Sequence, residues 1–181
     1  METARFDARR VLVQVLVLVA VAAMTRLVPH PPNFVPMGAI ALVSGAVLGH
    51  RALAYAVPLA GMLAADLVIG LHAQIPAVYA SMAVVVWLGS RLGGRRSLLP
   101  VTAASVAGST LFFLVTNLSV WAFDGLYPPT LEGLATCYVA ALPFYGNSLV
   151  ADLLFTWVLL GALGRLGTAK GVADQRLTAA S

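Results

Sequence analysis

The sequence predicts an all-α, polytopic membrane protein with about six transmembrane helices and a short interfacial or re-entrant helix at the external face. The chain of 181 residues is 60% hydrophobic and only 10% charged, whereas about a quarter of the residues in soluble domains are charged. Its apolar runs have the length of about 20 residues that a helix needs to cross a bilayer. Its basic residues gather between alternate runs, as in multi-spanning proteins.

Six runs have the length of membrane helices and lack the alternation of strands. Helices are expected because backbone groups inside a bilayer must be hydrogen-bonded within their own segment. In chain order the predicted spans are Val11–Val28, Phe34–Gly49, Ala52–Gly70, Ile75–Ser90, Leu98–Phe123 and about Pro143–Gly164.

The last apolar stretch is too long for a single crossing. A helix from Leu131 to Gly164 would measure about 50 Å, against a hydrocarbon core of about 30 Å. Thr130 follows two prolines and is a suitable N-cap, and Pro143 offers a break. We therefore expect a short external helix over Leu131–Leu142, a single transmembrane domain over residues 1–168, and a flexible cytoplasmic tail over 169–181.

The basic residues set the orientation. Short loops rich in Lys and Arg stay in the cytoplasm, which predicts a bacterial inner-membrane protein with both termini cytoplasmic. An alternative stays open, because the basic N-terminus, the Val/Leu run and Ala20-Val21-Ala22 also fit a cleaved signal peptide. The basic positions on the cytoplasmic side are Arg5, Arg9, Arg10, Arg51, Arg91, Arg95, Arg96, Arg165, Lys170 and Arg176.

The sequence lacks the motifs of several common kinds of chemistry. There is no phosphate-binding loop, no H-E-x-x-H or C-x-x-C motif and no G-x-S-x-G motif. The basic residues form no stripe with interleaved aromatics, so no nucleic-acid partner is expected. We expect no enzymatic activity, no cofactor and no metal site, with the lipid bilayer and a small solute as partners.

Polar residues inside predicted spans are the main functional clue, because a charge near the bilayer centre costs at least about 2.5 to 3.5 kcal/mol on insertion scales. Asp66 and Asp152 are the two carboxylates in such positions. They form either a ligand pocket or interhelical hydrogen bonds. The hydroxyls on the same helix faces, for which packing is the favoured interpretation, are Ser148 and Thr156 beside Asp152, and Thr102, Ser105, Ser109 and Thr116 on the preceding span.

The external end collects the remaining candidates. Prolines around His30 fix an extended backbone, which suits a rigid lid over a cavity. His30 and His72 could form a pH-responsive pair, but simple loop histidines are the favoured interpretation, and the aromatic residues also fit an interfacial belt. The predicted ligand-binding residues are Arg26, His30, Asn33, Asp66, Asn117, Trp121, Tyr127, Cys137, Tyr138, Asn147 and Asp152.

Two features have both a structural and a functional interpretation. Cys137, the only cysteine, is either a small buried hydrophobe or a thiolate able to bind a soft metal. Ala41, Gly45 and Gly49 form a small-residue helix face, which either packs inside the chain or docks a partner subunit.

Three segments carry a resemblance to a known family. They are Arg26–Phe34 (RLVPHPPNF), Phe112–Asn117 (FFLVTN) with Trp121, and Thr130–Leu134 (TLEGL) with Cys137, Tyr138 and Ala141–Phe144. Over nearly its whole length the chain resembles an uncharacterised family of small bacterial multi-spanning membrane proteins. More distantly, it resembles the S components of energy-coupling-factor vitamin transporters. The second resemblance implies an external pocket for a vitamin-like or metal-containing solute, and a coupling membrane subunit with ATPases.

The sequence thus predicts a substrate-binding or transport protein for a small solute. A non-transporting membrane scaffold or assembly protein remains an alternative, and an intramembrane enzyme using Cys137 or the carboxylates is a third. Fold resemblance alone does not choose among them.

Overall fold

A computed structural model describes residues 19–48, 51–93 and 97–179, and within these ranges every regular element is a helix. The predicted all-α class is confirmed. A first helix is described over residues 19–27. The others are α2 (Met37–Val47), α3 (Arg51–Ile69), α4 (Ile75–Arg91), α5 (Leu98–Phe123) and α6 (Leu131–Ala179).

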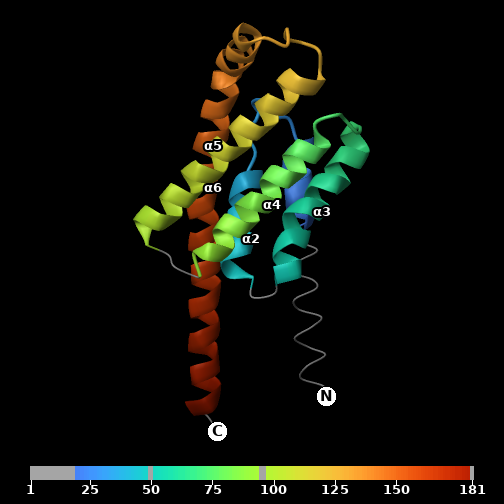
Figure 1. Ribbon diagram of the computed structural model, residues 1–181. Coiled ribbons are helices and arrows are strands. Elements are labelled where there is room, and N and C mark those ends of the chain that lie inside the picture. Colours follow the sequence, from blue (N-terminus) through green and yellow to red (C-terminus); the bar gives the residue numbers. More distant parts are fainter. Residues whose placement is uncertain (1–18, 49–50, 94–96, 180–181) are drawn as a thin grey trace.

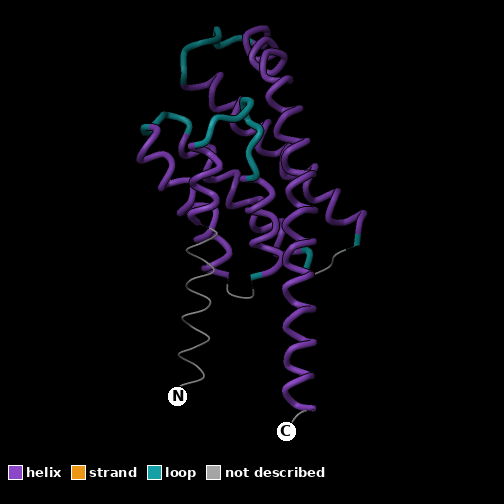
Figure 2. Tube along the Cα trace, turned by 180° about the vertical axis from the view of Figure 1, so that it is seen from behind, coloured by secondary structure: helices purple, strands orange, loops and turns teal. Residues whose placement is uncertain are grey.

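Successive helices run in alternating directions (Figure 1). The connections 28–36, 70–74 and 124–130, teal in Figure 2, lie at one end of the bundle, which we call the upper end. α2 and α4 end, and α3 and α5 begin, at the opposite, lower end. The loops therefore lie at the two ends of the bundle, with the apolar helices between them.

The short helix α2 forms the centre of the bundle and packs against α3, α4, α5 and α6. It begins three residues later than the predicted Phe34, because Pro36 occupies the N-cap position and the chain before it forms a turn. It ends where Leu48 adopts an extended conformation. Eight of its 11 residues are buried: Met37, Ala39, Ile40, Ala41, Leu42, Val43, Ser44 and Gly45.

Two glycines let α2 and α4 touch backbone to backbone. A Cβ on Gly45 would lie 2.0 Å from the Val86 carbonyl oxygen, and a Cβ on Gly89 would lie 2.0 Å from the Leu42 carbonyl oxygen. No side chain larger than hydrogen fits at either position. The small-residue face therefore packs inside the chain at Ala41 and Gly45, and is not free to dock a partner there. Gly49, its third member, lies outside the described residues.

The helix lengths do not confirm the expected number of crossings. Within the described chain, three helices contain segments long and apolar enough to cross a membrane: Ala52–Ile69, Leu98–Phe123 and Leu131–Ala162. α2 and α4 are apolar but shorter; the 11 residues of α2 span only about 16 Å. Residues 11–18 of the predicted first span lie outside the described residues, so six crossings are not confirmed.

The predicted break at Pro143 is wrong. α6 is one helix of 49 residues that continues through Pro143. A proline removes one backbone hydrogen bond and bends a helix, but a long apolar helix tolerates it when its neighbours support the bend. In both views the first turns of α6 are seen nearly end-on and the rest side-on, so the helix changes direction without ending (Figures 1 and 2).

The two ends of α6 can be compared with the predicted N-cap and the predicted C-terminal tail. Thr130 is the N-cap, as predicted, because its Oγ1 accepts a hydrogen bond from the Gly133 backbone N–H at 3.1 Å. At the other end, residues 169–179, which the sequence assigns to a tail, continue the helix. The division of the chain into a transmembrane domain and a flexible tail stays a prediction.

Candidate functional site

A cavity of about 200 Å³ opens near the upper end of α2. It brings together segments far apart in the sequence: the first helix and the loop after it, α2, α3, α4, α5 and α6. The lining residues are Arg26, Asn33, Val35, Met37, Gly38, Met62, His72, Val78, Met82, Phe112, Ser148 and Asp152. Arg26, Asn33 and Asp152 belong to the predicted ligand-binding set. His72 does not, because the sequence favours a simple loop histidine at that position.

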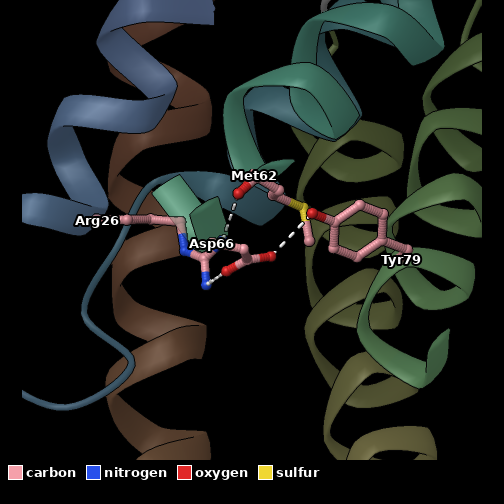
Figure 3. Close-up of polar contacts among 4 residues, drawn as sticks. All are labelled: Arg26, Met62, Asp66 and Tyr79. Atoms are coloured by element: carbon pink, nitrogen blue, oxygen red, sulfur yellow. Dashed lines mark hydrogen bonds and ion pairs between the residues drawn. The ribbon is translucent and has the colours of Figure 1, made fainter. Parts of the chain in front are cut away.

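An ion pair stands beside this cavity (Figure 3). Arg26 Nη2 lies 2.7 Å from Asp66 Oδ1, and Arg26 Nη1 donates a hydrogen bond to the Met62 carbonyl oxygen at 3.2 Å. The Tyr79 hydroxyl donates to Asp66 Oδ2 at 2.8 Å. Asp66 is 1% exposed, so its charge is balanced within the protein by a guanidinium and a phenol rather than by water.

The second buried carboxylate, Asp152, caps α2 from another helix. Its Oδ1 accepts a hydrogen bond from the Ala39 backbone N–H at 3.0 Å, and its Oδ2 accepts one from the Ser109 hydroxyl at 2.6 Å. The first N–H groups of a helix have no partner inside it, and Pro36 supplies no side-chain cap. The negative charge of Asp152 at this N-terminus also suits the helix dipole.

Gly38 makes this arrangement sterically possible. A Cβ at residue 38 would lie between 2.4 and 2.6 Å from the carboxyl atoms of Asp152. The buried face of α6 predicted from the four-residue spacing is confirmed, because Asp152 is 7% exposed and Thr156 is fully buried. In this position Asp152 both lines the cavity and holds α2 in place.

The loop between the first helix and α2 is fastened to α6. Asn147 Nδ2 donates a hydrogen bond to the Pro32 carbonyl oxygen at 2.9 Å, and the Ser148 hydroxyl donates to the Asn33 carbonyl oxygen at 3.4 Å. Asn33 has a φ of 60°, a left-handed conformation that asparagine tolerates better than most residues. The loop therefore has a defined position over the cavity.

Four other predicted residues lie away from the cavity, where α5 meets the segment 128–138. The Cys137 thiol contacts the Asn117 carbonyl oxygen at 3.5 Å, and the Tyr138 hydroxyl donates to the Leu114 carbonyl oxygen at 2.7 Å. Asn117 Nδ2 donates to the Phe113 carbonyl oxygen of its own helix. Trp121 Nε1 donates to the Pro128 carbonyl oxygen at 3.0 Å.

Asn117, Asn147 and Asp66, all in the predicted ligand-binding set, do not come together, because each has a different partner. His30 is exposed, and its Nδ1 lies 3.0 Å from the Pro31 carbonyl oxygen. Tyr127 is half-buried and is not among the residues that line the cavity.

Sequence reasoning missed several residues of the site. Tyr79 shows no signal in the sequence, because an aromatic residue in an apolar span predicts only packing. Gly38 could have been noticed as a glycine next to an expected helix start. The three methionines that line the cavity, Met37, Met62 and Met82, count as ordinary apolar residues in any periodicity analysis.

A second cavity, of about 760 Å³, lies at the lower end of α2. Its walls come from the last residues of α2, the start of α3 and the end of α4. Arg91 and Trp87 are among its lining residues, and the guanidinium carbon of Arg91 lies 5.4 Å from the centre of the Trp87 ring. The two cavities are thus at opposite ends of the same short helix.

These features define an all-helical protein with helices able to cross a membrane and polar groups gathered inside the bundle. The described residues contain no group of three His, Cys, Asp or Glu side chains arranged to hold a metal ion. Residues 6–172 match a family of unknown function (DUF6580), and the chain belongs to that family. No match was found among curated proteins or solved structures.

Proposed function

We propose that the protein is a substrate-binding and transport protein for a small solute, located in the bacterial inner membrane with its upper end external and both termini cytoplasmic. The observation that carries the proposal is the pair of cavities at opposite ends of α2. The polar lining of the upper cavity, which includes Arg26, Asn33, His72 and Asp152, supports the binding of a polar or charged solute.

The length of α2 supports transport in particular. This helix has 11 residues, about 16 Å, whereas the hydrocarbon core is about 30 Å thick. A solute in the upper cavity therefore has about half of the hydrocarbon thickness left to cross before it reaches the lower cavity. A protein that serves only as a scaffold has no need of hollows at both ends of its central helix.

The volume of the upper cavity limits the solute. At about 30 Å³ per water molecule, 200 Å³ corresponds to about seven waters. A solute of a few non-hydrogen atoms, or a single ion with its ligands, fits within this space, whereas a larger solute would have to extend out of the opening. The distant resemblance to S components implies a vitamin-like or metal-containing solute, and of these two classes the proposal favours the smaller solute.

The scaffold alternative has its own supporting observation. Asn117, Cys137, Tyr138 and Trp121 make hydrogen bonds or contacts within the chain, and Asp152 stabilises α2. In addition, Gly45 packs against α4, so this glycine provides no docking face for a coupling subunit. A coupling partner, if there is one, would have to bind elsewhere.

Filling the upper cavity separates the two functions. Val78 lines this cavity from α4, and Val84 on the same helix is exposed outside it. Val78→Phe and Val84→Phe add the same side-chain volume, so the second is a matched control. Each protein is extracted from its native membrane, and co-purifying small molecules are identified by mass spectrometry.

We expect wild type and Val84→Phe to carry the same solute and Val78→Phe to lose it. In vesicles loaded with protein, uptake of that solute should fall in the same order. Equal solute content in all three proteins, or no solute in any of them, would favour the scaffold instead.

A further inference from the structure

Methionine is concentrated around the upper cavity. Three of the five methionines in the chain line it: Met37 from α2, Met62 from α3 and Met82 from α4. All three are at most 5% exposed, whereas Met24 is 55% exposed. Leucine far outnumbers methionine in the sequence, yet no described residue that lines the cavity is leucine. Most of the thioether groups of the chain therefore lie around this cavity.

The chemistry of the thioether gives this concentration a meaning. Thioether sulfur is a soft ligand that selects Cu(I), and imidazole also binds copper. His72 lines the same cavity as the three methionines. Methionine side chains have three rotatable bonds, so sulfur atoms carried on three different helices can converge on one ion.

We propose that the upper cavity binds a soft monovalent metal ion, Cu(I) or its analogue Ag(I), through Met37, Met62 and Met82 with His72. The inference rests on the proposed function, since it names the class of solute that the cavity takes. It also adds a metal site that the sequence did not predict, because thioethers are absent from the usual metal-binding motifs.

The charge balance of the cavity favours a cation. The positive charge of Arg26 is neutralised by Asp66 at 2.7 Å. Asp152 has no ion-pair partner among the described residues. Its carboxyl oxygens are hydrogen-bonded to the Ala39 N–H and the Ser109 hydroxyl. A bound cation would supply the opposite charge that the described residues do not place beside this carboxyl group.

Leucine substitutions test the sulfur atoms directly. Met→Leu nearly conserves volume and usually costs less than about 1.5 kcal/mol in a core, so the variants should fold. The full-length protein in detergent is titrated with Cu(I) in competition with a chromogenic chelator, and the Cu(I) complex is examined by X-ray absorption. The variants are Met62→Leu, Met82→Leu and the pair together, with the exposed Met24→Leu as matched control.

We expect wild type and Met24→Leu to bind one Cu(I) with sulfur in the first coordination shell. Changes around metal ligands typically lower metal affinity about 10- to 100-fold, and each single cavity variant should lose at least that much. The double variant keeps only Met37 of the three proposed thioether ligands, so its sulfur signal should be much weaker than that of wild type. Unchanged affinity in the double variant, or a shell of nitrogen and oxygen only, overturns the inference and leaves the methionines as packing residues.

The same variants distinguish failure of the metal site from failure of the proposed function. If wild type binds no Cu(I), yet Val78→Phe removes another co-purifying solute, the metal site is wrong and the binding function stands. If Cu(I) binds through sulfur but vesicles take up none, the metal site stands and transport is wrong.

Discussion

Asp66 and Asp152 are both buried carboxylates, but their neighbours give them different roles. Asp66 faces a guanidinium from the first helix and a phenol from α4. Asp152 faces the N-terminus of α2 and a hydroxyl of α5. Their positions in apolar spans predict that both point inward. Their partners could not be predicted, because Arg26 and Ala39 are brought to them only by the packing of distant helices.

The ion pair leads to a prediction about stability. Asp66→Asn leaves the guanidinium of Arg26 without its counter-charge, and removing one partner of a buried pair costs about 3 to 5 kcal/mol. Because the Arg26 side chain is 19% exposed, we expect a loss toward the lower end of this range. It should appear as a lower melting temperature in detergent.

The control removes both charges. Arg26→Met combined with Asp66→Leu takes away the pair and leaves no unpaired charge, and such replacements are often neutral. The double variant should therefore melt closer to wild type than Asp66→Asn does. If it melts as low as the single variant or lower, the ion pair is not the reason for the loss.

At the scale of helices, the sequence predicts the ends of α3, α4 and α5 well. It is less accurate for α2 and α6, where the prediction depends on the effect of a proline. α3, α4 and α5 lie within one residue of the predicted Ala52–Gly70, Ile75–Ser90 and Leu98–Phe123. α2 starts later than predicted because the chain through Pro36 forms a turn. α6 continues through Pro143 because a proline can bend a supported helix without ending it.

The contact between α2 and α4 leads to the second prediction. Gly45→Leu should lower the melting temperature of the isolated protein strongly, because even a Cβ would lie 2.0 Å from the Val86 carbonyl oxygen. Overpacking a core typically costs about 1 to 3 kcal/mol and sometimes more. Thermal denaturation in detergent measures the effect.

Gly146→Leu is the matched control, because a Cβ on Gly146 meets nothing within 4 Å. It should change the melting temperature little. A folded Gly45→Leu protein with normal stability would mean that α2 and α4 are not in this close contact, and the small-residue face would again be available for a partner.

At the scale of the whole molecule, the alternating direction of the helices (Figure 1) and the basic residues predict a definite topology. Reporters fused after Ser181 and inserted at Gly94 should read cytoplasmic, and one near Gly125 should read external, because short basic loops are retained in the cytoplasm. An external reading at Ser181 would reverse the orientation or require an odd number of crossings.

The cavity is the part of the molecule that the sequence could not predict. Arg26, Asn33 and Asp152 are unusual residues in apolar or proline-rich surroundings, and the cavity brings them together. Asn117, Cys137 and Tyr138 were unusual for the same reasons but serve the contact between α5 and α6. Polarity in an apolar chain reveals that a group needs a partner, but not whether the partner is a ligand or a neighbouring helix.

The paired glycines of α2 and α4 also restrict how the protein can change shape. Gly45 and Gly89 each abut a backbone carbonyl of the other helix, so sliding either helix by a turn would drive side chains into backbone. α2 and α4 therefore cannot slide along each other while they stay in contact. A rearrangement that opens one cavity and closes the other, with α2 and α4 still in contact, has to come from movement of the first helix, α3, α5 or α6 relative to this pair.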